Sequence, residues 1–268
     1  MIGWNNFIVF AMLSIVLWAT GAIITAFVNG KNLRNISIAA TTTGIAVFAC
    51  FIAGLWVTLQ RPPLRTMGET RLWYSLFMAV SGLIVYLRYG YRWILSFSAL
   101  LATVFIIINL CKPEIHDQTL MPALQSVWFV PHVTVYMFSY SIFGCTFIFA
   151  LKGLISKSCK YLTAADNLVY IGFAFLSLGM ISGCIWAKQA WGSYWSWDPK
   201  ETWAAATWAV YAIYIHKRRK ANDLHDGLLP ADRQCYIWLI IGFILLQMCW
   251  YGVNLLPSAS QSLHSYIN

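Results

Sequence analysis

The sequence predicts an all-α integral membrane protein, a polytopic bundle of about eight transmembrane helices with both termini on the outer side. The composition is the first observation behind this prediction: 60% of the 268 residues are hydrophobic and only 10% are charged. A chain of this length cannot bury so much apolar surface in one soluble core. The second observation is that apolar segments long enough to cross ~30 Å of hydrocarbon recur along the chain.

Eight segments are expected to span the membrane. In order, they cover residues 4–28, 36–59, 72–87, 93–111, 131–151, 167–187, 199–216 and 234–256. The first has no Lys or Arg before it, so it lacks the basic region of a cleaved signal and is expected to be a retained helix. The third is short because Arg71 and Arg88 bracket it, and we expect both side chains to extend to the headgroups. No internal repeat is visible, which predicts a single transmembrane domain over 1–268.

The basic residues predict the orientation, because the loop set richer in Lys and Arg is normally cytoplasmic. Of the eighteen, that set holds Lys31, Arg34, Arg88, Arg92, Lys152, Lys157, Lys160, Lys217, Arg218, Arg219, Lys220 and Arg233. The opposite set holds Arg61, Arg65, Arg71, Lys112, Lys188 and Lys200. Both termini and segment 191–203 are therefore expected outside. The net charge of +9 follows from this topology, so the lipid bilayer is an expected partner and nucleic acid is not.

Residues 191–203 read Trp-Gly-Ser-Tyr-Trp-Ser-Trp-Asp-Pro-Lys-Glu-Thr-Trp. Such an aromatic platform at a membrane surface is either an interfacial anchor or a face on which a flat, polarisable ligand lies. Asp198 and Glu201 have capping-box spacing, with Pro199 at the first helical position. We interpret both acids as holding a helix start rather than as catalytic groups. A fixed helix start would also fix the angles of three indoles, those of Trp195, Trp197 and Trp203.

Three of the five histidines are candidate ligands. His132 follows Pro131, which is favoured at a first helical position, so it is expected in the first turn of the fifth span at the outer face. His264 lies in the outer C-terminal tail. His216 ends the seventh span on a stripe of small residues that leaves room for either a neighbouring helix or a planar cofactor. The stripe consists of Ala205, Ala209 and Ala212. Each histidine alone is also compatible with an ordinary interfacial residue.

The segment 191–203 resembles the tryptophan-rich WWD signature of heme-handling membrane proteins. Its ending, Asp-Pro-Lys-Glu-Thr-Trp, resembles the CcsA family, also called ResC, of cytochrome c biogenesis system II. Other agreeing stretches are Pro62 to Met67, Leu124 to Trp128, Tyr211 to His216 and Tyr251 to Asn254. The resemblance covers a CcsA-like core over 61–268, whereas residues 1–60, two N-terminal helices, are only generically transmembrane.

The resemblance implies a set of heme-binding residues. His132 and His264 correspond to axial ligands of the heme iron at an outer site, and His216 to an iron ligand at an inner site. The tryptophan segment would cradle heme b through Trp191, Gly192, Tyr194, Trp195, Trp197, Asp198 and Trp203. In the family the second inner ligand comes from the CcsB component, so a CcsB/ResB-like membrane protein is an expected partner.

The implied activity is that of a cytochrome c synthase, or heme lyase, acting mainly by positioning heme. Such a protein moves heme across the membrane and attaches it to the C-x-x-C-H motif of apocytochrome c on the outer face. A thiol-reducing thioredoxin-like protein is a further expected partner. The expected location is the bacterial cytoplasmic membrane, or the thylakoid membrane for a plastid-encoded chain.

Two other classes stay open at this point. A CcmC-like exporter or chaperone shares the tryptophan motif and outer histidines, but delivers heme without forming thioethers. An electron-transfer subunit of the b-cytochrome type needs facing histidine pairs at mid-helix positions, and no histidine here lies in the middle of a predicted span.

Overall fold

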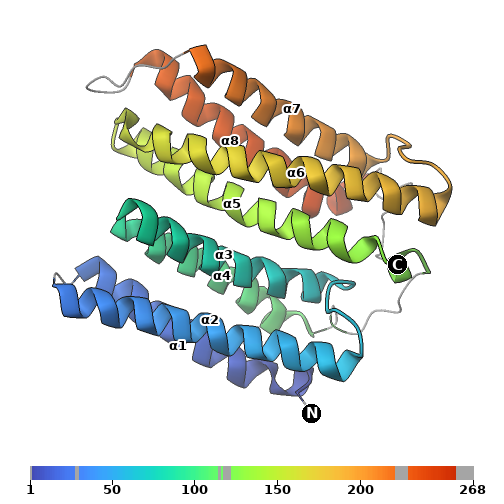
Figure 1. The fold of residues 1–268 in the computed structure, drawn as a ribbon, viewed down its shortest axis with the longest axis horizontal. Helices are drawn as coiled ribbons and strands as arrows, with labels where there is room; N and C mark the ends of the chain where they lie inside the picture. The colour runs from blue at the N-terminus through green and yellow to red at the C-terminus, as the bar shows by residue number, and fades with distance from the viewer. Residues whose placement is uncertain (1, 28–29, 114–115, 117–121, 221–228, 258–268) are drawn as a thin grey trace. The chain divides into compact units, whose positions relative to one another are not determined.

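The computed structural model describes residues 2–27, 30–113, 116, 122–220 and 229–257 (Figure 1). All regular secondary structure in these residues is helical, which confirms the all-α prediction. Eight long helices coincide with the eight predicted spans, and seven of them are long and apolar enough to cross a membrane. The chain divides into two compact units, 1–120 and 121–268. That 1–268 act as one functional domain stays a prediction.

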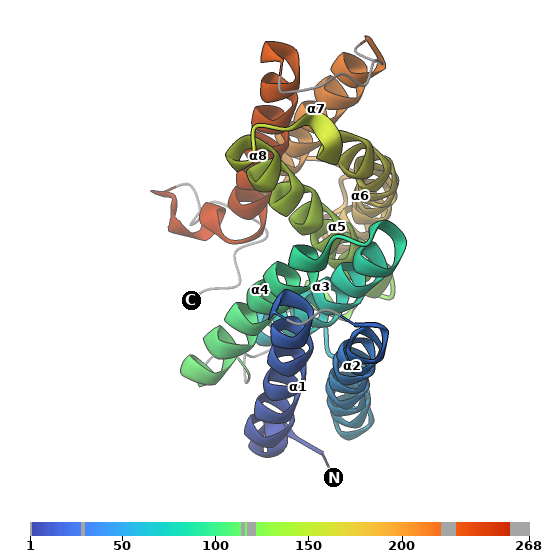
Figure 2. The same cartoon turned by 90° about the vertical axis from the view of Figure 1, so that its left-hand side faces the viewer.

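The first unit contains four helices. They are α1 (Phe7–Phe27), α2 (Lys31–Leu59), α3 (Met67–Tyr89) and α4 (Arg92–Cys111), preceded by the 3-10 turn η1 (Trp4–Asn6). Helix α1 packs against α2 and α4, and α3 packs against α4 and α2 (Figure 2). Helices α3 and α4 approach closely because Gly82 has no side chain: a Cβ there would lie 1.9 Å from Ser98 Oγ.

Helix α3 starts earlier than predicted because a capping box holds its first turn. The N–H of Glu69 donates to Thr66 Oγ1 at 3.1 Å, and the Glu69 carboxylate accepts from the N–H of Thr66 at 3.2 Å. The same buried carboxylate accepts from two guanidinium nitrogens of Arg61, at 2.8 and 2.9 Å. The expectation for Arg71 was wrong: this residue is buried, at 6% exposure, whereas Arg88 is exposed.

The second unit contains the remaining helices. They are α5 (Phe129–Ile155), α6 (Leu162–Trp191), α7 (Pro199–Lys220) and α8 (Pro230–Trp250), with 3-10 turns η3 (Pro122–Gln125), η4 (Cys159–Tyr161) and η5 (Gly252–Leu255). Helix α5 packs most extensively against α6, and α7 against α8. In Figure 1 the connection from α6 to α7 lies at the same end of this unit as the start of α5.

Helix α7 is the one that does not meet the hydropathy criterion for a span. Its 22 residues give a length of about 33 Å, but charged residues occupy its first and last turns. At the last turn, Asp166 of α6 accepts from the Tyr214 hydroxyl at 2.6 Å and from Arg218 Nη2 at 2.8 Å. The predicted inner end of α7 is therefore fixed to α6 by a partly buried ion pair.

Candidate functional site

His132 lies in the first turn of α5, as predicted, although the helix starts at Phe129. Pro131 is consequently the third residue of α5 and not the first, which corrects the predicted boundary. A proline is tolerated throughout a first turn because the N–H groups there have no acceptor within the helix.

The tautomer of His132 follows from a single hydrogen bond. His132 Nδ1 lies 2.8 Å from the carbonyl oxygen of Gly179 in α6. A carbonyl oxygen can only accept, so Nδ1 carries a proton, and in the neutral ring Nε2 then has the lone pair. Metal-binding imidazoles are commonly oriented in this way, with one ring nitrogen donating to a carbonyl while the other coordinates. The ring is thus prepared to coordinate through Nε2.

Two neighbours fix the plane of the His132 ring. The indole of Trp186 stacks on it with centroids 5.5 Å apart and an interplanar angle of 22°, and Tyr136 meets it edge-on at 4.7 Å. Gly183 makes this approach sterically feasible, because a Cβ there would lie only 2.6 Å from His132 Cε1. The imidazole is therefore held on three sides by α5 and α6.

Trp186 connects His132 to the tryptophan segment. Its side chain is 1% exposed, and its Nε1 donates to the carbonyl oxygen of Ala123 at 2.8 Å. Trp191 contacts the same indole edge-on, with centroids 4.7 Å apart. The structure thus brings two predicted site residues, His132 and Trp191, onto one buried indole that the sequence reasoning missed. A usable signal was its spacing of seven residues from Gly179 and three from Gly183, which puts all three on one helix face.

The remainder of the aromatic segment forms the loop from α6 to α7. Gly192 ends α6 with φ of +82°, a conformation that glycine adopts without strain. Lys188 donates to the Gly192 carbonyl at 2.8 Å and lies 5.4 Å from the ring centroid of Tyr194. Tyr194 and Trp197 are 58% and 70% exposed. Trp195 has a buried Nε1 with no hydrogen-bond partner among the described residues, so its donor is available to an added acceptor.

The two acids of the segment cap α7, which confirms the prediction from their spacing. Asp198 Oδ1 accepts from the N–H of Lys200 at 2.9 Å. Glu201 Oε2 accepts from the N–H of Asp198 at 3.2 Å and from the N–H of Ser196 at 2.8 Å. Both acids are buried, at 6% and 8% exposure. Immediately before these caps, Trp197 has φ of +57°, which is unusual for a residue with a side chain, and half-buried Trp203 follows within α7.

His216 is not brought to this site. His216 is exposed near the far end of α7, seventeen residues and about 25 Å along the helix from Pro199. Its alanine stripe is half-buried to exposed, so within the described part of the second unit His216 faces outward from the packed helices. His264 lies outside the described residues.

Fold and site define a polytopic helical membrane protein with an oriented imidazole and an aromatic wall at one end of its second unit. The sequence model of the family described as "Cytochrome C assembly protein" matches residues 7–260. The chain belongs to this family, which confirms the resemblance. The family membership implies a role in cytochrome c maturation and in heme handling.

Individual relatives agree with the family assignment. The protein named cytochrome c biogenesis protein CcsA in Chlamydomonas reinhardtii is 34% identical over 260 residues, which cover 88% of this chain and 70% of that one. The CcsA protein of Mesostigma viride is 37% identical over 205 residues, covering 63% and 64%. That of Cucumis sativus is 30% identical over 317 aligned positions, covering 96% and 93%.

Proposed function

We propose that this chain is the heme-positioning component of a cytochrome c synthase, which attaches heme b to apocytochrome c. His132 and His264 are the proposed axial ligands at the outer site, and the tryptophan segment is the wall of that site. His216 is the proposed ligand at an inner site, from which heme is transported. The second inner ligand would come from a CcsB/ResB-like partner.

The observation that carries the proposal is the state of His132. Its Nδ1 is hydrogen-bonded to the carbonyl oxygen of Gly179, as is common in metal-binding imidazoles, and its ring stacks on the buried indole that also contacts Trp191. An interfacial histidine with no ligand has no need of a fixed tautomer or of a glycine to admit its ring. The buried, unpaired Trp195 donor is suited to an acceptor on the bound molecule, such as a propionate oxygen.

The chemistry asks little acid–base work of the protein. Each cysteine thiol of the substrate adds across one vinyl group: a C–S bond forms, the thiol proton goes to the neighbouring vinyl carbon, and nothing leaves. The residues of this chain would bind and orient heme and exclude water from it. Asp198 and Glu201 contribute by holding the aromatic loop, because their carboxylates are occupied by backbone N–H groups.

The matched relatives carry the CcsA name, which favours synthesis over the CcmC-like delivery of heme. The proposed location is a bacterial cytoplasmic membrane or a thylakoid membrane, with attachment on the outer or lumenal side. A thioredoxin-like protein that keeps the substrate thiols reduced is the further proposed partner.

The test is co-expression of the chain with a CcsB-like partner and an apocytochrome c, measuring holocytochrome by heme stain and by absorbance. We expect His132→Gly to lose holocytochrome and to regain it when imidazole is supplied, because free imidazole replaces the missing ligand. His225→Gly is the control, because the sequence gives His225 no proposed role as a heme ligand, and it should be unaffected. Normal maturation in His132→Gly without imidazole would reject the ligand assignment. Heme bound by the wild-type complex without thioether formation would instead favour the delivery function.

A further inference from the structure

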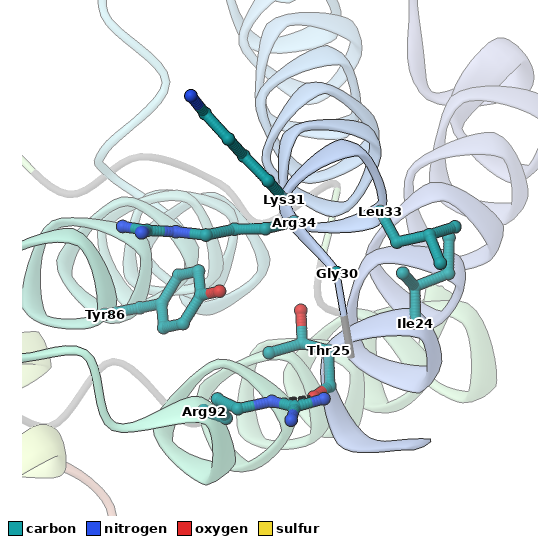
Figure 3. Close-up of a pocket in the computed structure, with 8 residues that line it drawn as sticks. All are labelled: Ile24, Thr25, Gly30, Lys31, Leu33, Arg34, Tyr86 and Arg92. Carbon is teal, nitrogen blue, oxygen red and sulfur yellow. Dashed lines mark hydrogen bonds between the residues drawn. The ribbon is translucent and has the colours of Figure 1, made fainter. Parts of the chain in front are cut away.

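A basic cavity lies at one end of the first unit, and none of the proposed heme ligands lines it (Figure 3). Its volume is about 340 Å³, and α1, α2, α3 and α4 all contribute to its lining. Three of the lining residues are cations, Lys31, Arg34 and Arg92. All three belong to the basic set whose side the charge distribution predicts to be cytoplasmic.

The cations are held by neutral neighbours. The guanidinium of Arg34 lies 5.9 Å from the ring centroid of Tyr86, and Nε of Arg92 donates to the carbonyl oxygen of Thr25. Figure 3 shows Arg34 beside Tyr86 and Arg92 beneath Thr25, while Lys31 extends away from the cavity. The first turn of α2 adds its positive helix end, because its N-cap is Gly30, which has no side chain to accept a hydrogen bond.

No acidic side chain of the four helices is available to neutralise this end of the unit. Residues 1–120 contain only three acids, Glu69, Glu114 and Asp117. Glu69 is in the first turn of α3, seventeen residues or about 25 Å before Tyr86, and it is bound to Arg61. Glu114 and Asp117 follow the end of α4 in the sequence, whereas Arg92 begins that helix. Among the described residues of this unit, the cavity therefore has positive charge and no acid at the same helix ends.

The opposite side of the cavity is apolar. Ile24 and Leu33 line it, and they lie side by side in Figure 3. Outside the cavity the same helices expose further apolar side chains, with Ile23 at 59%, Phe27 at 82% and Ile36 at 51% exposure. A ligand that fits this surface has an anionic head of phosphate size and an apolar tail. A free inorganic anion would contact only the basic side of the cavity and not the apolar side.

We infer that this cavity binds the headgroup of an anionic phospholipid from the cytoplasmic leaflet. Arg34 and Arg92 contact the phosphate, and the acyl chains lie along the exposed apolar faces of α1 and α2. Basic pockets between transmembrane helices on this side of a membrane bind anionic headgroups in the same way. The bound lipid supplies the negative charge that the four helices lack at this end of the unit.

The experiment uses the full-length chain, purified in detergent from a membrane that contains phosphatidylglycerol. Retained lipid is measured by mass spectrometry, and melting temperature is measured after adding phosphatidylglycerol, phosphatidylcholine or inorganic phosphate. We expect phosphatidylglycerol alone to raise the melting temperature. Arg34→Gln should lower retained phosphatidylglycerol by about fivefold and remove that rise, since one basic residue near a surface contributes roughly this factor.

Arg88→Gln is the matched control, because Arg88 is an exposed cation in the last turn of α3 that does not line the cavity. It should retain phosphatidylglycerol to within about twofold of wild type, since a general surface charge contributes little on its own. Arg34 is itself exposed, so Arg34→Gln should fold normally. Equal lipid retention in Arg34→Gln and wild type, or equal losses in Arg34→Gln and Arg88→Gln, would overturn the inference. If inorganic phosphate raised the melting temperature as much as phosphatidylglycerol does, the phosphate group bound in the cavity would not need to come from a lipid, and the lipid assignment would be overturned.

Discussion

The substitution Gly183→Ala should disturb the proposed ligand site while leaving the stability of the fold nearly unchanged. The added Cβ would lie 2.6 Å from His132 Cε1 and 2.8 Å from Nδ1. Carbon atoms in contact normally lie about 3.5–4.0 Å apart, so the imidazole has to move by about 1 Å. That movement would stretch the 2.8 Å hydrogen bond to Gly179 beyond a useful length. The ring would then lose both its position and its fixed tautomer.

The two contributions to stability largely cancel. Loss of the hydrogen bond costs about 1 kcal/mol. Replacing a glycine inside a helix with alanine raises the free energy of unfolding by about 1 kcal/mol. The melting temperature should therefore stay within a few degrees of wild type. Displacing a reacting group by about 1 Å, in contrast, lowers activity by about a hundredfold. We expect a folded protein that forms almost no holocytochrome.

The assay measures holocytochrome yield and melting temperature for Gly183→Ala and for Gly172→Ala. Gly172 lies on the same helix and faces α5 as well, where its Cβ would meet Phe143 Cε1 at 2.9 Å, three turns away from His132. A general packing defect would affect both variants alike. Wild-type holocytochrome yield from Gly183→Ala would refute the reasoning, because the site could then accept a displaced ring.

Three further predictions concern the second unit. Asp198→Asn should change the free energy of unfolding by less than about 0.5 kcal/mol, because asparagine also caps well. Glu201→Ala should lower it by about 2 kcal/mol, and thermal unfolding measures both effects. Loss of holocytochrome in Asp198→Asn at unchanged stability would indicate direct heme contact instead. His216→Ala should leave the melting temperature unchanged, because the side chain is exposed. It should lower the heme absorbance of the complex with the partner by about half. Unchanged absorbance would show that His216 is not a ligand at the inner site. Asp166→Asn should cost about 2 kcal/mol by weakening the contact with Arg218, and a melting temperature equal to wild type would contradict that role.

The helices could be predicted because hydropathy and capping signals are local in sequence. All eight predicted spans are helices, and the start of α7 follows from Asp198 and Glu201 alone. The start of α3 was placed five residues late because the apolar run begins only after Arg71. A charged residue normally ends a predicted span. The burial of Arg71 in the folded chain cannot be recognised from the sequence alone.

The candidate site was predicted less completely than the fold. Its residue types stood out in the sequence, since His132 and Trp191 belong to conspicuous stretches. The residue that joins them, Trp186, lies inside an apolar run that looks like any other membrane span. Its role depends on how α5 and α6 pack, and at this site the packing depends on Gly179 and Gly183 of α6, whose partners Tyr136 and His132 lie more than forty residues earlier in the chain.

Trp197 combines an exposed indole with a left-handed backbone, and this pairing has a thermodynamic consequence. A residue with a Cβ in that conformation carries about 1 kcal/mol of strain relative to glycine. The hydrogen bonds of the buried caps on its C-terminal side, at Asp198 and Glu201, offset this strain during folding, before any ligand binds. A ligand that stacks on the indole would therefore lose little freedom in ordering the loop. Glycine at this position would make the folded chain more stable and the aromatic face smaller, so Trp197 marks a place where selection for thermal stability and selection for ligand binding act in opposite directions.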